Sequence, residues 1–226
     1  MNYPVPAIYD YTLVSRIAPR PIDVDDLIQQ LKLDPDLAND TDFVAYVNAL
    51  IDAAVICGEK FTRRTFQESN FESYLDYFVS SGFGLTTFSR YSACSSAYEI
   101  RQSPFQAMTS IEYYSDGTLT AIDSSNYYTT KSLEYASMAP ANGYTWPSAD
   151  NRLQAIEIKF TAGYKEGELP ADLKQALLLH VAAMFSNRGD CTFESVTSQV
   201  TVTQNLPPMA KSIYQKNRII DLRMGL

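Results

Sequence analysis

Hydrophobic residues recur at three- and four-residue spacing in three parts of the chain, and this spacing predicts three amphipathic helices. The first helix begins at Asp23, which forms a capping-box pattern with Asp26, and it continues to Leu31. The second covers residues 40–64 and follows a turn at Asp34 to Asp36. Its apolar residues alternate at steps of four and three, the spacing of a seam between packed helices. These residues are Phe43, Val47, Leu50, Ala54, Cys57 and Phe61.

The third helix follows a short strand and a turn. In the strand, apolar and polar residues alternate from Ile156 to Phe160. Pro170 suits the first helical position, because its missing N–H would have no partner there, and Asp172 adds a favourable negative charge to the first turn. The helix is expected to end near residues 187–189. Its predicted apolar face consists of Leu173, Ala176, Leu177, His180, Val181, Met184 and Phe185.

Residues 67–165, between the helices, have the short β-branched and aromatic runs of an antiparallel β module. Asp116-Gly117 separates two of these runs, which predicts a hairpin. Residues 80–96 and 136–151 are predicted as long surface loops, with Trp146 as the residue that packs. Strands are predicted at residues 71–79, 98–101, 109–114, 119–122 and 153–160.

The sequence therefore predicts an α+β fold. A small helical core, made of two N-terminal helices and one later helix, is interrupted by the β module and followed by a C-terminal arm. The five predicted segments are an N-terminal arm (1–20), the first part of the helical core (21–66), the inserted β module (67–165), the second part of the core (166–190) and the C-terminal arm (191–226).

Composition excludes several classes of protein. The net charge of −8 argues against a nucleic-acid-binding protein, because binding to phosphates needs clustered Lys and Arg. Three widely spaced cysteines form no C-x-x-C pair, so neither a disulfide framework nor a zinc knuckle is expected. Residues 1–20 lack the features of a signal peptide, and no apolar run long enough to span a membrane is evident. We therefore expect a soluble protein made in a cytoplasm.

Candidate chemistry is sparse. The single histidine, His180, lies on an apolar helix face, where a packed or interface histidine is a simpler interpretation than a catalytic base. Asp34 to Asp42 imitate part of a calcium loop, but the glycine and the bidentate glutamate of such a loop are missing. Phosphate-loop and nucleophile-elbow motifs are absent. No catalytic residue, metal or cofactor is predicted.

Two blocks of sequence nevertheless resemble the head-tail connector (adaptor) proteins of tailed bacteriophages and related particles. One block runs from Phe160-Thr-Ala-Gly-Tyr164 through Leu169-Pro-Ala-Asp-Leu-Lys-Gln-Ala176 to Asn187-Arg188. The other contains Pro21-Ile-Asp-Val-Asp-Asp-Leu27 and the long helix that ends at Arg63-Arg64. Together the blocks cover residues 15–66 and 108–188, while residues 79–96 and 129–152 match nothing in the family and are interpreted as insertions.

The resemblance implies a structural virion protein at the head-tail neck, made in the host cytoplasm. Identical subunits, usually twelve in this family, would form a ring below the portal protein, through which DNA passes without sequence-specific binding. A downstream neck or tail-completion protein would be a further partner, and no membrane is involved. The predicted ring interface consists of Phe43, Val47, Leu50, Ala54, Phe61, His180 and Met184.

The last residues differ from the rest of the chain. Residues 204–226 have four cations and one acid, and many apolar side chains after Leu206-Pro207-Pro208. Since exposed tails rarely keep so many apolar groups, we expect a short helix at 209–218 in an arm that orders on the portal protein. The alternative is that the tail packs on its own body. The predicted portal-binding residues are Lys211, Ile213, Tyr214, Arg218, Ile219, Ile220, Leu222 and Arg223.

Two other functions remain open at this stage. The tyrosine-rich β module is compatible with binding glycans or a cell surface. A pair of carboxylates could also catalyse glycoside hydrolysis without any local motif. Neither function would need a basic, apolar C-terminal segment, so this segment favours the connector interpretation.

Overall fold

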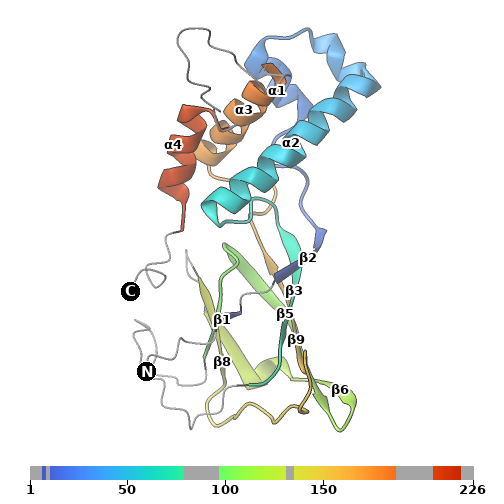
Figure 1. Ribbon diagram of the computed structural model, residues 1–226, viewed down its shortest axis with the longest axis vertical. Coiled ribbons are helices and arrows are strands. Elements are labelled where there is room, and N and C mark those ends of the chain that lie inside the picture. Colours follow the sequence, from blue (N-terminus) through green and yellow to red (C-terminus); the bar gives the residue numbers. More distant parts are fainter. Residues whose placement is uncertain (1–6, 9–10, 79–96, 131–134, 187–205, 220–226) are drawn as a thin grey trace, which may run out of the picture. The chain divides into compact units, whose positions relative to one another are not determined.

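In the computed structural model, the described residues are 7–8, 11–78, 97–130, 135–186 and 206–219. They form two compact units (Figure 1). The β unit comprises the described residues up to Ala18 and those from Gln67 to Lys165, and the helical unit comprises Pro19–Phe66 and the described residues from Glu166 onward. The fold is α+β, which confirms the prediction.

The helical unit contains four α-helices and one short 3-10 helix among its described residues. Asp23 caps the first of these helices by accepting from the Asp26 backbone N–H at 2.8 Å, and the Asp26 side chain accepts from the Asp23 N–H at 3.2 Å. Asp40 caps the long second helix by accepting from the Asp42 and Phe43 backbone N–H groups at 2.9 and 3.2 Å. The elements are α1 (Val24–Leu31), η1 (Pro35–Asn39), α2 (Thr41–Thr62), α3 (Ala171–Ser186) and α4 (Pro208–Asn217).

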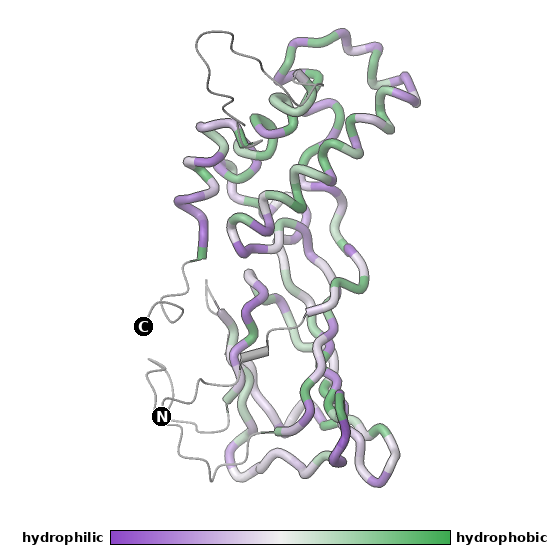
Figure 2. Tube along the Cα trace, viewed as in Figure 1, coloured by the Kyte–Doolittle hydropathy of each residue, from purple (hydrophilic) through white to green (hydrophobic). Residues whose placement is uncertain are grey.

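Hydrophobic positions recur along α2 and α3, and these helices form the core of the helical unit with α1 and α4 (Figure 2). The apolar face predicted for α3 is confirmed, since its first five members, His180 among them, are buried. An ion pair at 2.9 Å between Lys174 and Asp26 links α3 to the start of α1. The fully buried side chains include Leu27, Val47, Ile51, Ala54, Leu173, Ala176, Leu177, Val181, Ala210 and Tyr214.

The β unit contains two sheets. A four-stranded sheet has the order β1-β4-β8-β7 and is antiparallel except for the β1–β4 pair, and an entirely antiparallel five-stranded sheet has the order β2-β3-β9-β5-β6. A short 3-10 helix, η2 (Ser124–Asn126), precedes β7. The strands are β1 (Ala7–Ile8), β2 (Tyr11–Arg16), β3 (Ser69–Leu75), β4 (Tyr98–Ile100), β5 (Phe105–Ser115), β6 (Thr118–Ala121), β7 (Tyr127–Thr130), β8 (Ala136–Pro140) and β9 (Ile156–Ala162).

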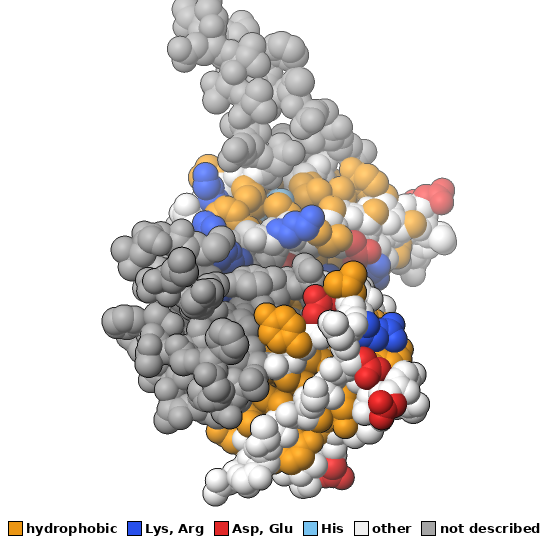
Figure 3. Space-filling view, turned by 60° about the horizontal axis from the view of Figure 1, so that its bottom comes forward, with side chains coloured by type: hydrophobic (Ala, Val, Ile, Leu, Met, Phe, Trp, Pro, Cys, Tyr) orange, Lys and Arg blue, Asp and Glu red, His pale blue; other side chains and the backbone are white. Residues whose placement is uncertain are grey.

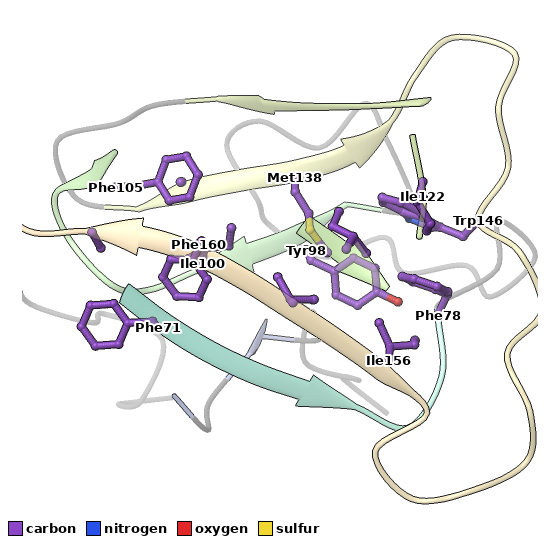
Figure 4. Packing of buried hydrophobic residues seen from close by; sticks show 14 residues of the cluster. Phe71, Phe78, Tyr98, Ile100, Phe105, Ile122, Met138, Trp146, Ile156 and Phe160 are labelled. Atoms are coloured by element: carbon purple, nitrogen blue, oxygen red, sulfur yellow. The ribbon is translucent and has the colours of Figure 1, made fainter. Parts of the chain in front are cut away.

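Side chains from both sheets meet in one aromatic core (Figure 4). Phe71 of β3 stacks on Phe160 of β9, with ring centroids 5.6 Å apart. Phe78 stacks on Trp146 at 4.9 Å, so the packing role predicted for Trp146 is confirmed. At the end of β9, Gly163 has φ +111°, and a Cβ there would lie 2.1 Å from the Gln67 carbonyl oxygen. This close approach explains why the turn after β9 contains glycine.

Two sequence expectations for the β unit are wrong. Residues 11–16 are not part of a separate arm, because they form β2, where the Tyr11 ring contacts Phe160 edge-on and the Tyr11 hydroxyl accepts from the Arg101 N–H at 2.7 Å. Residues 136–140 are not a loop but strand β8, with Met138 in the core. The predicted loop at 80–96 lies outside the described residues.

Candidate assembly surfaces

Helix α4 is an integral part of the helical unit, although the sequence predicted it in a free arm. The helix itself is confirmed within one residue of the predicted bounds. Tyr214, near its middle, is fully buried between α2 and α3. Its ring lies 6.2 Å from each of the rings of Phe61, Phe66 and His180.

Hydrogen bonds fix the end of α4. The Ile219 N–H donates to the Thr62 carbonyl at 2.9 Å, and the Arg64 guanidinium donates to the Asn217 carbonyl at 2.7 Å. The Asn217 side chain in turn donates to the Asp172 carboxylate at 2.7 Å. The chain is therefore held against the ends of α2 and α3 as far as Ile219.

This packing corrects part of the predicted portal-binding set. Tyr214 and Ile219 are buried within the helical unit, so they are core residues and not a surface that a partner can reach. For residues 208–219, the alternative that the tail packs on its own body is the correct one. Lys211 and Ile213 are half-buried and Arg218 is exposed, so their docking role stays a prediction. Ile220, Leu222 and Arg223 lie outside the described residues.

The predicted ring interface is also partly corrected. Val47 and Ala54 are fully buried and His180 is 2% exposed, so these three pack within one subunit. The alternating seam of α2 is the side of the helix that faces α3 and α4, as the edge-on contact between Phe43 and Phe185 illustrates. The half-buried residues of the set, Phe43, Leu50, Phe61 and Met184, stay predicted interface residues.

The side of α2 away from α3 and α4 has an exposed apolar face that sequence reasoning missed. We call it the α2 face, and it consists of Ala45, Ala49, Ala53 and Ile56, with Tyr46 at its border, where the Tyr46 ring also lies 6.2 Å from the Phe185 ring of α3. Tyr46 is 39% and Ile56 is 47% exposed. A bidentate ion pair between Arg20 and Asp52, at 2.7 and 2.8 Å, lies beside this face. Three alanines on one side of a helix would let another helix approach closely.

By length and composition, α2 is apolar enough to cross a membrane, in contrast to the sequence expectation that no such stretch is present. Core helices of soluble proteins pass the same test, and the seam of α2 is buried against α3 and α4. Helix α2 therefore has apolar residues on two opposite sides, and only one of these sides packs against other helices of the subunit.

Burial shifts the pKa values of His180 and Tyr214. Desolvation lowers the pKa of His180, whose Nδ1 has no hydrogen-bond partner. Desolvation also raises the pKa of the Tyr214 hydroxyl, which is buried and unpartnered too. Because the Tyr214 hydroxyl has no hydrogen-bond partner, it forms no acid–base pair with His180, whose ring meets the Tyr214 ring edge to face. Within the described residues, no group of three or more His, Cys, Asp or Glu side chains could hold a metal ion.

The β unit exposes large apolar side chains of its own (Figure 3). Leu13 and Val14 of β2 are 44% and 52% exposed, and Leu119 of β6 is 41% exposed. Tyr77, Tyr128 and Leu153 are also exposed. Single exposed apolar residues need no explanation, but β2 and β6 are the two edges of one sheet.

The fold is shared with chains of gene transfer agent (GTA) particles. A chain from the neck of an empty GTA particle with C6 symmetry matches with a TM-score of 0.68 and 16% identity, over 95% of this chain and 97% of that chain. A chain from the virion of a native particle matches with a TM-score of 0.63 and 18% identity, over 94% and 96%. A chain from the neck of a native particle with C12 symmetry matches with a TM-score of 0.53 and 18% identity, over 92% and 95%.

No protein-family model and no curated protein matches the sequence. At 16–18% identity, the structural matches establish a common fold along nearly the whole chain.

Proposed function

We propose that this chain is a structural protein of the neck of a phage-like particle. It acts there as an adaptor without catalytic activity, as a ring of identical subunits, twelve in number, below the portal protein. The supporting observation is the fold common to this chain and to chains from the necks of GTA particles, over more than nine tenths of both. Those necks were computed with C6 and C12 symmetry, which supports a ring of identical subunits.

The α2 face supports the ring. A helix with apolar residues on two opposite faces normally buries both, yet one of these faces of α2 is exposed in the isolated subunit. We assign a second copy of the chain to this side, because identical subunits side by side in a ring bring the same helical unit next to itself. The half-buried Phe43 and Leu50, at the border of the face, would complete the contact.

The net charge of −8 suits a ring through which DNA passes. Negative charge repels the DNA backbone, so DNA can slide without being bound. In the proposed assembly the partners are the portal protein on one side and a downstream neck or tail-completion protein on the other. The protein would be made in the host cytoplasm before it joins the virion.

Only the accessible part of the C-terminal segment is proposed to dock on the portal protein. Since the chain is anchored as far as Ile219, residues 220–226 and the cationic surface of α4 are the proposed portal contact. Lys211, Lys216 and Arg218 give α4 a positive surface without any acidic residue.

A reconstruction of the particle that contains this chain tests the proposal. The expected result is a closed ring of this chain at the neck, in contact with the portal protein. One or two copies at the neck, or copies elsewhere in the particle, would contradict it. A monomer in dilute solution would not decide the matter, since closure can require the portal protein.

A further inference from the structure

The five-stranded sheet ends in two strands, β2 and β6, that carry little charge along their edges, although β2 has a register irregularity between Leu13 and Ser15 and β6 is only four residues long. Natural edge strands are commonly blunted by charged residues or proline, because an open edge is a template for another strand. β2 has the sequence YTLVSR, with a charge only at its last residue, and β6 has the sequence TLTA, with none. Residues 12–15 of β2 and all four residues of β6 are exposed.

Each of these strands pairs with one neighbour among the described strands. β2 pairs with β3, and β6 pairs with β5. The outer backbone edge of each strand therefore faces away from the sheet. Both strands belong to the β unit, so their relation is fixed by the sheet itself.

The two edges also have matching direction. The sheet has four neighbouring strand pairs between β2 and β6, and all four are antiparallel. Because the direction reverses four times, β2 and β6 run in the same direction. A second copy beside the first, related by a small rotation, keeps its strand direction. Its β6 would thus lie along β2 of the first copy as a parallel partner, and each copy would offer one edge to each neighbour. Such a head-to-tail contact forms a ring when the rotation between neighbouring copies closes on itself.

The exposed apolar side chains of the two edges agree with this pairing. If the two strands are aligned from their first residues, Tyr11 is level with Thr118, and Leu13 is level with Thr120. The exposed Leu13, Val14 and Leu119 would lose water contact when the strands pair.

We propose that β2 of each copy pairs in parallel with β6 of the next copy, so that the five-stranded sheets join into a continuous sheet around the ring. This inference rests on the ring proposed above and identifies its contact in the β unit. An isologous pairing of β2 with β2 of a second copy would produce only dimers and would leave β6 open.

Cysteine cross-linking of the chain assembled with its portal protein tests the pairing. In a background with Cys57→Ala, Cys94→Ser and Cys191→Ser, the double variant L13C/T120C would be oxidised and separated under denaturing conditions. The expected result is a ladder of multimers. Neither L13C nor T120C alone should give one, and the pair L13C/T130C is the matched control, because Thr130 is an exposed residue on an edge strand of the other sheet.

The outcomes separate this inference from the proposed function. A ring seen by electron microscopy without a ladder above the control would overturn the β2–β6 pairing and leave the neck function intact. Dimers from L13C alone would also overturn it, in favour of the isologous pairing. If no ring forms with portal protein or in the particle, both proposals fail.

A second set of variants needs no cross-link. T120K and V14K place a charge on an exposed position of each edge, where the fold should tolerate it. Each should reduce the yield of rings at least tenfold relative to T130K, with unchanged melting temperatures of the subunit. Equal ring yields for all three variants would overturn the pairing.

Discussion

Tyr214 lies directly against Gly58, so closely that a Cβ added to Gly58 would be 3.2 Å from the Tyr214 ring. The same Cβ would be 2.6 Å from the ring of Phe66, a distance that real Cβ atoms do not adopt. Glycine normally weakens a helix interior by about 1 kcal/mol relative to alanine. In α2 it is needed because α4 and the chain after α2 pack onto the helix at this point.

Replacing Gly58 with leucine should therefore destabilise the subunit by about 1–3 kcal/mol, in spite of the better helix propensity of leucine. Chemical denaturation of the purified chain measures this change. Gln175→Leu is the control, since it adds the same side chain at an exposed position of α3. Equal stability of the two variants would mean that Phe66 and Tyr214 do not pack on α2 at Gly58 as described.

Tyr214 allows a sharper test of the same contact. Tyr214→Ala should cost about 3–5 kcal/mol, because it removes a large buried ring. Tyr214→Phe should be neutral or stabilising, by up to about 1 kcal/mol, because the buried hydroxyl has no hydrogen-bond partner. Thermal denaturation of both variants checks the pair of expectations. A marked loss of stability in Tyr214→Phe would reveal a partner for the hydroxyl.

Two truncations should behave differently. Deletion of residues 206–226 removes Ala210, Tyr214 and Ile219 from the core and should destabilise the helical unit. Deletion of residues 220–226 should leave the melting temperature unchanged and reduce binding to the portal protein. Co-purification with portal protein at low and high salt measures the binding, which should weaken as salt screens the cations of α4. Wild-type binding by the shorter truncation would exclude residues 220–226 from docking.

Stability should depend on pH through His180. Its pKa in the folded state is lowered by desolvation from the ordinary value of 6.5, so the unfolded state binds the proton more readily. Stability should thus be complete above pH 6.5 and decrease as the pH falls below it, towards the folded pKa. Melting curves between about pH 8 and pH 5 test this window, which lies above the carboxylate range. His180→Leu should remove the slope, and an unchanged slope in that variant would assign it to other groups.

The α2 face should matter for assembly and not for folding. Ala49→Glu and Ala53→Glu introduce charge at exposed positions, where substitutions typically change stability by less than about 0.5 kcal/mol. Both variants should fold normally and fail to form rings on the portal protein. Native mass spectrometry measures the assembly, with Gln175→Glu as the control on α3. Normal rings from both variants would show that the α2 face is covered by something other than a second copy.

Calcium should have no effect on stability. Asp34 accepts from the Asp36 N–H at 3.0 Å, and Asp40 accepts from the Asp42 N–H at 2.9 Å, so these carboxylates cap η1 and α2. Asp40→Ala should cost about 1 kcal/mol through the lost cap. Melting curves with calcium and with a chelator should coincide. A shift of several degrees on adding calcium would mean that Asp34 to Asp42 form a cation site.

Local signals in the sequence determined the helices and much of the five-stranded sheet. The aspartates that cap α1 and α2 act within a few residues of themselves. The Asp116-Gly117 turn also marks the hairpin of β5 and β6 locally, although the distant Asp150 carboxylate accepts from both of its backbone N–H groups. The strand β2 was missed because its partner β3 is distant in sequence. The strands β7 and β8 pair with each other across a short connection and were missed because they are short and alternate only weakly.

The tertiary structure decided which apolar groups are covered. The seam of α2, from Phe43 to Phe61, could equally have faced a second subunit, and periodicity alone cannot distinguish these cases. Tyr214 likewise could have filled a groove on a partner or one in its own subunit. The choice depends on Gly58, whose missing side chain leaves room for Tyr214 on α2, and only the packed structure brings these two residues together.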